Sequence, residues 1–177
     1  MSLVEFSSRS RFRRSVVNAA IVSVLACIGC GAATAATVSH SVSVEGSPSA
    51  VWALIGPFCA IRDWLPPVGT CSEDGATPPT RTLVTKDGKA TFVERQIARD
   101  DGEHFYTYAF VSSPLPVTHY TSTIRVTSLG NGRSSVTWLG TYTPDPGKEQ
   151  AAREALDGIY AAGLDSIQIQ ARQRSHD

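Results

Sequence analysis

The feature that most constrains this chain is a series of strand-like segments that ends in one long amphipathic helix. Residues 80–142 alternate apolar and polar side chains, and Gly- and Asp-containing turns at 86–89, 99–102 and 130–132 separate the segments. Short turns of this kind join antiparallel neighbours. From residue 149 to 170 apolar side chains recur at helical spacing. The pattern predicts one antiparallel sheet whose apolar face is covered by this helix.

Before this region the sequence predicts one strand and two short helices. The strand alternates from Val38 to Glu45, Ser47-Pro48 is a typical helix start, and the second helix spans Phe58 to Trp64. The six further strands are expected at residues 68–72, 80–85, 90–98, 104–111, 120–128 and 134–142. The fold class is therefore α+β with seven strands. A curved sheet around a helix leaves a gap, and such gaps are common places for small-molecule cavities.

The first 35 residues have the three parts of a signal peptide. Four arginines precede an uncharged apolar run at 16–28, and Ala33-Thr34-Ala35 fits a small-residue cleavage site. The run is too short to cross a bilayer, which needs about 20 apolar residues. We expect residues 36–177 to form one domain in the periplasm or outside the cell, without a transmembrane segment. The export route stays open between general secretion, a twin-arginine signal at Arg13-Arg14 and a lipoprotein cysteine at Cys27.

The charge balance argues against nucleic-acid binding. The chain has 16 Lys and Arg against 16 Asp and Glu. The expected leader holds four Arg and one Glu, so the remainder has 12 basic and 15 acidic residues, a net charge of −3. No basic run occurs in it, and a basic patch is the usual electrostatic signature of nucleic-acid partners.

Two cysteines remain after the leader, Cys59 and Cys71. In an oxidising compartment we expect a disulfide between them, which a chain-entropy model values at roughly 3 kcal/mol. The alternative is a pair of buried free thiols. No metal site is expected, because no histidine lies close to either cysteine in the sequence.

The order and spacing of these segments resemble the SRPBCC superfamily, also called START or Bet v 1-like, and in particular its polyketide cyclase/dehydrase-like branch. The residues that carry the resemblance are 44–52, 58–66, Arg81, Glu94, 114–120 and 136–140. The resemblance implies a helix-grip fold, in which a seven-stranded curved antiparallel sheet wraps around the C-terminal helix. The layout is also similar to that of the periplasmic MxaD-like members, which assist methanol dehydrogenase.

Three functions are compatible with this resemblance. The first is binding of a small apolar or amphipathic ligand. The second is an enzyme of the polyketide cyclase/dehydrase type. The third is an accessory protein that docks onto a periplasmic redox enzyme such as methanol dehydrogenase. The sequence lacks a nucleophile elbow, a metal signature and a cofactor motif, so no cofactor is expected and the binding function is favoured.

Arg81 and Glu94 are the catalytic candidates. Each stands in an alternating strand segment among apolar or β-branched neighbours. An inward-facing arginine would hold a carboxylate or an enolate, and the glutamate would accept a proton. The alternative is a structural ion pair or a pair of solvent-facing side chains. The alternation does not decide between them, because residues 92, 94 and 96 and residues 93, 95 and 97 are equally plausible inner faces.

The candidate ligand contacts also include an aromatic set from the sheet and a stretch of the long helix. A tyrosine fits a pocket wall because its buried hydroxyl needs a partner. The alternative is an ordinary aromatic core, which is favoured for Phe110 and Trp138. The predicted contacts besides Arg81 and Glu94 are Trp64, Tyr106, Tyr108, Tyr120, Trp138, Tyr142, Ile159, Tyr160 and Gly163.

Overall fold

The computed structural model describes residues 34–175. The predicted signal peptide, apart from Thr34 and Ala35, lies outside the described residues. The elements in chain order are β1 (Ala36–Glu45), α1 (Pro48–Ile55), the 3-10 helix η1 (Phe58–Ala60), α2 (Ile61–Trp64), β2 (Val68–Glu73), β3 (Thr80–Thr85), β4 (Thr91–Asp100), β5 (Phe105–Ser112), β6 (Val117–Gly130), β7 (Arg133–Pro144) and α3 (Glu149–Arg174).

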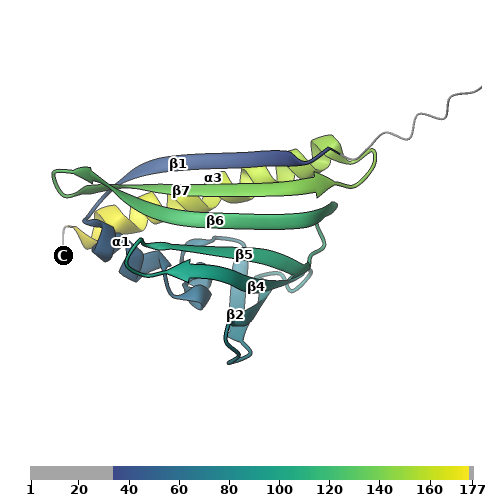
Figure 1. Ribbon diagram of the computed structural model, residues 1–177, viewed down its shortest axis with the longest axis horizontal. Coiled ribbons are helices and arrows are strands. Elements are labelled where there is room, and N and C mark those ends of the chain that lie inside the picture. The colour runs from purple at the N-terminus through teal and green to yellow at the C-terminus, as the bar shows by residue number, and fades with distance from the viewer. Residues whose placement is uncertain (1–33, 176–177) are drawn as a thin grey trace, which may run out of the picture. The chain divides into compact units, whose positions relative to one another are not determined.

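The seven strands form one antiparallel sheet in the order β1-β7-β6-β5-β4-β3-β2. Every neighbouring pair from β2 to β7 is a hairpin, and β1 joins the other edge by pairing with β7. Helix α3 runs behind β1 and β7, and the short helices lie beneath the other strands (Figure 1). This arrangement confirms the predicted α+β helix-grip fold.

Local signals place the short helices where the sequence predicted them. Ser47 caps α1 by accepting a hydrogen bond from the amide of Ala50, and Pro48 occupies the first turn. The expected second helix is divided into η1 and α2, because the tighter 3-10 turn directly follows Pro57. Helix α3 continues to Arg174, four residues past the expected end.

The pairing of β4 is regular with β3 and irregular with β5. The β4–β5 register shifts between Val93 and Glu94 and again between Gln96 and Ala98. A bulge of this kind adds a residue to one strand and increases its twist. On the β3 side Glu94 lies opposite the buried Arg81. Glu94 and Gln96 are buried, whereas Ile97 is exposed. The sequence left this choice open, and the structure selects the face of Glu94.

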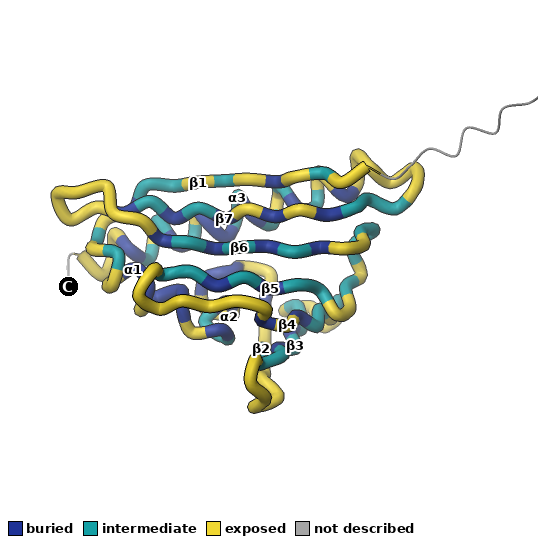
Figure 2. Tube along the Cα trace, viewed as in Figure 1, coloured by how far each residue is buried: buried dark blue, intermediate teal, exposed yellow. Residues whose placement is uncertain are grey.

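Helix α3 packs tightly on the sheet because two glycines make room for aromatic rings. The ring of Tyr160 stacks on that of Trp138 with 4.1 Å between centroids, and its hydroxyl lies over Gly140. A Cβ at Gly140 would stand 2.4 Å from the Tyr160 Oη atom. One turn further along α3, a Cβ at Gly163 would stand 2.8 Å from the Trp138 ring. Figure 2 shows the resulting buried segments on α3 and the central strands.

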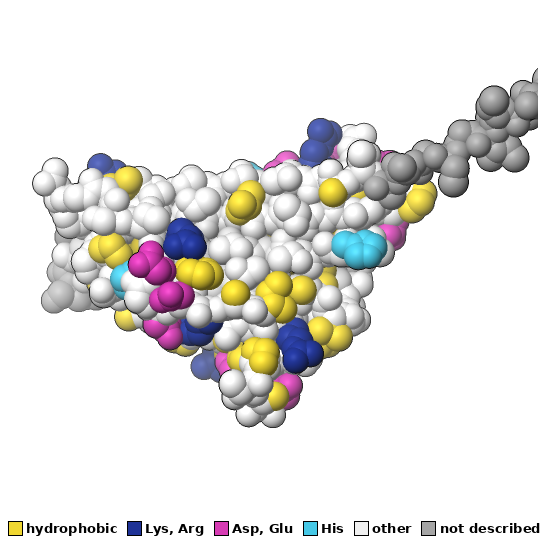
Figure 3. All heavy atoms as spheres, in the orientation of Figure 1, with side chains coloured by type: hydrophobic (Ala, Val, Ile, Leu, Met, Phe, Trp, Pro, Cys, Tyr) yellow, Lys and Arg dark blue, Asp and Glu magenta, His cyan; other side chains and the backbone are white. Residues whose placement is uncertain are grey.

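The sheet's outer face is mostly polar. Figure 3 shows hydrophobic side chains there as separate patches among other residues. On the inner side a disulfide joins Cys59 of η1 to Cys71 of β2, as expected from the sequence. None of the helices in residues 34–175 combines the length and apolarity needed to cross a bilayer.

The packing around α3 predicts opposite effects for two glycines in the same helix. Gly163→Ala places a methyl group against the Trp138 ring, so we expect a net loss of about 1–2 kcal/mol in the free energy of unfolding despite the better helix propensity. Urea unfolding followed by circular dichroism measures this change.

Gly158→Ala is the matched control. Gly158 is exposed, and nothing lies within 4 Å of a Cβ built there. The alanine should therefore stabilise the helix by up to about 1 kcal/mol. Equal shifts in both variants would contradict the close packing of α3 at Gly163.

Candidate functional site

A cavity of about 240 Å³ lies between the inner face of the sheet, the α2–β2 segment and α3. Its wall is almost entirely apolar, with one carboxylate and three hydroxyl groups. The lining residues are Ile61, Leu65, Pro67, Val68, Leu83, Thr85, Ala90, Phe92, Glu94, Tyr108, Phe110, Tyr120, Trp138, Leu156 and Ile159.

The volume fits a small organic molecule. An engineered apolar cavity of about 150 Å³ holds one benzene molecule. The cavity here is larger, which leaves room for a molecule of one or two rings. It is smaller than the pockets of about 300–1,000 Å³ that bury drug-sized ligands.

The structure divides the predicted ligand contacts into two groups. Those on the cavity wall are Glu94, Tyr108, Tyr120, Trp138 and Ile159. Those that do not line it are Trp64, Arg81, Tyr106, Tyr142, Tyr160 and Gly163. Ligand contact by the first group stays a prediction. Members of the second group support the wall, since Tyr160 and Gly163 both pack against Trp138.

Arg81 and Glu94 form a buried ion pair, of which only Glu94 lines the cavity. They face each other on β3 and β4, with Arg81 fully buried and Glu94 4% exposed. Arg81 Nε donates a hydrogen bond to Glu94 Oε2 over 2.6 Å, and Nη2 lies at the same distance without hydrogen-bond geometry. Arg81 Nη1 donates to the carbonyl oxygen of Phe58, and its guanidinium lies 4.0 Å from the centre of that residue's ring.

Glu94 lies between Arg81 and the cavity. Within residues 34–175 the side-chain nitrogens that contact the Glu94 carboxylate, both from Arg81, contact its Oε2 atom, whereas Glu94 itself lines the cavity. Burial raises the pKa of the Glu94 carboxyl above its ordinary value, and the positive charge of Arg81 partly opposes that shift. For Arg81 burial opposes the charged form, but the interactions with Glu94, Tyr106 and Tyr108 together outweigh it and raise the pKa of the guanidinium. Glu94 is thus the charged group that a ligand would meet first.

The tyrosines form a buried hydrogen-bonded network. Trp138 Nε1 donates to Tyr108 Oη over 3.2 Å, and Tyr108 Oη lies 3.4 Å from Tyr120 Oη. Tyr120 Oη lies 2.7 Å from Tyr160 Oη, which in turn lies 2.6 Å from Ser122 Oγ. Burial raises the pKa of Tyr108 and of Tyr120 well above the ordinary tyrosine value. Both hydroxyls therefore stay protonated at physiological pH.

Sequence reasoning missed most of the apolar wall. Phe110, assigned to the core, stacks on Tyr120 with 3.9 Å between ring centroids and lines the cavity. Leu83, Phe92 and Leu156 also line it. The alternating pattern marks such residues as inward-facing, but the same pattern occurs in a solid core, so no local signal identifies them as cavity residues.

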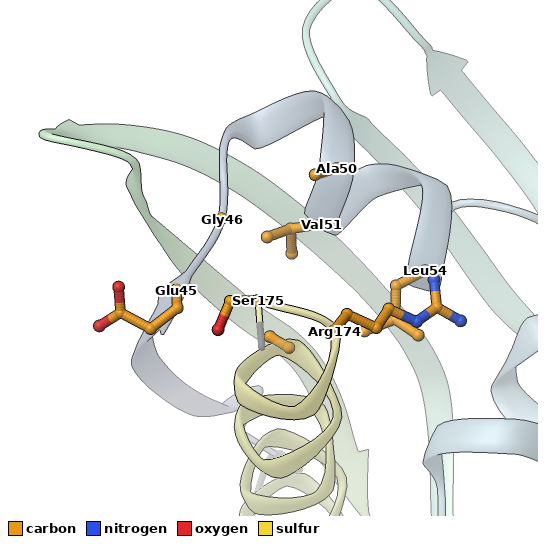
Figure 4. Close-up of a pocket in the computed structure, with 8 residues that line it drawn as sticks. Glu45, Gly46, Ala50, Val51, Leu54, Arg174 and Ser175 are labelled. Carbon is orange, nitrogen blue, oxygen red and sulfur yellow. The ribbon is translucent and has the colours of Figure 1, made fainter. Parts of the chain in front are cut away.

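Another pocket, of about 170 Å³, lies between α1 and the C-terminal end of α3 (Figure 4). Its charged residues, Glu45 and Arg174, are exposed, and no predicted site residue lines it. Within residues 34–175 no group of three or more His, Cys, Asp and Glu side chains is arranged to hold a metal ion.

The sheet, the long helix and the apolar cavity define this protein as a helix-grip domain. The model of the family described as "Polyketide cyclase / dehydrase and lipid transport" matches residues 35–171. This chain belongs to that family, within the SRPBCC superfamily. No curated protein matches the chain.

Solved structures support the same assignment. The protein XoxI from Bacillus cereus is 36% identical, with a TM-score of 0.74 over 80% of this chain and 99% of its own. The Zhui aromatase/cyclase from Streptomyces sp. R1128 is 19% identical, with a TM-score of 0.67 over 80% of this chain and 96% of its own. Norcoclaurine synthase from Thalictrum flavum is 19% identical, with a TM-score of 0.63 over 80% of this chain and 97% of its own. The last two show the fold alone.

The buried ion pair predicts a pH-dependent defect in Arg81→Met. Without the guanidinium, the folded-state pKa of Glu94 rises further above its unfolded value, because burial acts unopposed. The folded protein then binds the proton more tightly, so stability is retained at low pH and lost as pH rises through the folded-state pKa. We expect a loss of about 3 kcal/mol at pH 7 and a smaller loss at pH 5, measured by urea unfolding.

Arg95→Met provides the control, because Arg95 is exposed on the adjacent position of β4. It should change stability by less than about 0.5 kcal/mol at both pH values. The double variant Arg81→Met/Glu94→Leu should recover most of the lost stability. A loss in Arg81→Met that is independent of pH would refute the assigned role of the pair.

Proposed function

We propose that this protein is an exported binding protein for one small, largely apolar molecule, held in the 240 Å³ cavity beside Glu94. The observation that carries the proposal is an apolar cavity with a single carboxylate in its wall. Burying apolar ligand surface supplies binding free energy, and a few polar groups fix the ligand's orientation.

The construction of the cavity supports this proposal over a packing defect. Random voids in protein cores are few and close to the size of a water molecule. Here the polar groups on the wall are held by buried partners, Arg81 behind Glu94 and Tyr160 behind Tyr120. Held in this way, they keep their positions without a ligand and lose little freedom when one binds.

A catalytic function is the second candidate, and the position of Glu94 favours it. A carboxylate with a raised pKa in the wall of an apolar cavity is suited to general acid–base chemistry. In this alternative Glu94 moves a proton of the bound molecule and Arg81 holds the carboxylate in place. Assigning the reaction requires the identity of the ligand.

Export and docking onto a periplasmic protein are separate parts of the proposal. The leader pattern in the first 35 residues and the Cys59–Cys71 bridge both suit an oxidising compartment. A protein partner, including a redox enzyme, is compatible with an exported carrier that delivers its ligand to a client.

The binding proposal predicts that the purified protein takes up naphthalene, a two-ring molecule that suits the cavity volume. Isothermal titration calorimetry should give a one-to-one complex. Ala90→Trp places an indole into the cavity and should weaken binding at least about tenfold. Ala98→Trp, on the exposed end of β4, should leave the affinity unchanged. Binding that is insensitive to Ala90→Trp would place the ligand elsewhere.

The export proposal predicts the mass of the product made from the full-length chain in a Gram-negative host. The periplasmic fraction should contain residues 36–177, lighter by two hydrogens than the reduced form because of the disulfide. Intact-mass spectrometry measures both features. Recovery of the uncleaved chain in the cytoplasm would contradict export. Replacing Arg13 and Arg14 by lysine should stop export only if the twin-arginine route is used.

A further inference from the structure

The hydrogen-bonding state of the cavity wall indicates what polar group its ligand carries. Five side chains on the wall have polar atoms: Thr85, Glu94, Tyr108, Tyr120 and Trp138. Each hydroxyl has one proton to donate, the indole has one N–H, and an ionised carboxylate has no proton to donate. The indole N–H of Trp138 is already donated to Tyr108 Oη. A wall side chain can therefore donate to the ligand only if one of the three hydroxyl protons is free.

The hydroxyl proton of Thr85 is already used in a hydrogen bond within the protein. Its hydroxyl donates to the Asp87 carboxylate over 2.6 Å and accepts from the amide of Ala90 over 3.1 Å. The contact with Asp87 is a hydrogen bond to a charged acceptor, which is among the stronger kinds. Thr85 therefore offers a ligand no free donor.

The hydroxyl protons of Tyr108 and Tyr120 are also used within the protein, in a chain of hydrogen bonds that ends at the Leu139 carbonyl. Only one assignment of protons makes every contact in that chain a hydrogen bond. Ser122 donates to the carbonyl oxygen of Leu139 over 3.0 Å, so it must accept from Tyr160. Tyr160 has then used its proton and accepts from Tyr120.

The same reasoning fixes the remaining link. Tyr120 has used its proton, so it accepts from Tyr108, which itself accepts from Trp138 Nε1. All hydroxyl protons in the chain are thus donated in the direction of the Leu139 carbonyl, and none is left for a ligand. The Tyr108–Tyr120 link, at 3.4 Å, is the longest in the chain. It is the link that a ligand acceptor would have to break.

Like the wall hydroxyl groups, Glu94 offers a ligand only hydrogen-bond acceptors. The Arg81 nitrogens contact Oε2, and within residues 34–175 no side chain or backbone group donates a hydrogen bond to Oε1. Arg81 itself does not line the cavity, so its donors do not reach a ligand. The indole N–H of Trp64 has no partner among the described residues, but Trp64 does not line the cavity either.

We infer that the cavity selects apolar molecules that carry a neutral hydrogen-bond donor, a hydroxyl or an N–H group, which binds Glu94. This inference rests on the proposed binding function and adds the chemical class of the ligand. A molecule whose polar groups only accept, such as an ether or a ketone, leaves Glu94 without a partner. An anionic carboxylate also meets the Glu94 charge across an apolar space, which is unfavourable.

The test compares three probes of similar size on the purified protein by calorimetry. 2-Naphthol donates a hydrogen bond, 2-methoxynaphthalene only accepts, and 2-ethylnaphthalene does neither. We expect 2-naphthol to bind at least about tenfold more tightly than 2-methoxynaphthalene, as befits a hydrogen bond to a carboxylate. 2-Methoxynaphthalene should gain nothing over 2-ethylnaphthalene.

Ser122→Ala tests the direction of the proton chain without touching the cavity wall. Removing the Ser122 hydroxyl leaves Tyr160 with Tyr120 as its remaining acceptor, so the Tyr160–Tyr120 bond should reverse. One proton of the Tyr108–Tyr120 pair then has no acceptor in the chain and is available to a ligand, because both residues line the cavity. The affinity ratio of 2-naphthol to 2-methoxynaphthalene should fall at least about threefold, because the methoxy oxygen gains a donor.

Ser134→Ala is the matched control. Ser134 is likewise fully buried and donates to a backbone carbonyl, that of Gly46, but it lies outside the tyrosine chain. Its affinity ratio should equal that of the wild type. Equal affinity of 2-naphthol and 2-methoxynaphthalene for the wild type, or an unchanged ratio in Ser122→Ala, would overturn the donor selectivity while the binding function stands. If none of the probes binds, including 2-ethylnaphthalene, both proposals fail.

Discussion

The packing of Tyr160 between α3 and the sheet is the contact on which the rest of the structure depends. Its ring stacks on Trp138 and its hydroxyl occupies the space that a side chain at residue 140 would fill. Because Gly140 has no side chain, α3 can lie close to β7 at this level. The helix cannot follow the sheet as it curves away toward β2, so the space at that end becomes the cavity.

The polar groups of the cavity wall are held by residues that do not themselves line the cavity. Arg81 binds Glu94 and also donates to the Phe58 carbonyl, which ties β3 and β4 to η1. Tyr120 is held by Tyr160 in the same manner. Such support orients the wall before a ligand arrives. Proteins of different activities share this fold. Selectivity for a ligand then depends on which hydroxyl protons of the cavity wall are already donated to other groups of the protein.

Sequence reasoning was most successful where one local pattern decides the outcome. The alternation of the strands, the Ser47 cap and the apolar stripe of α3 predicted the elements within a few residues. It was weaker for the site. Nothing in the residues around Glu94 shows which face of β4 is buried, because its partner Arg81 lies on another strand. Tyr160 has the helical spacing of a ligand contact, but it lies behind Trp138 and does not line the cavity.

The sequence by itself determined the order of the elements and the antiparallel hairpins, because these follow from periodicity and turn residues along the chain. Its resemblance to a known superfamily indicated the helix-grip fold. Tertiary structure alone decided the size of the cavity, the inward position of Glu94 and the direction of the tyrosine hydrogen bonds. Each of these depends on atoms brought together from distant segments. The Leu139 carbonyl directs the proton of Tyr108 through three intervening hydroxyl groups, and no local pattern in the chain records that connection.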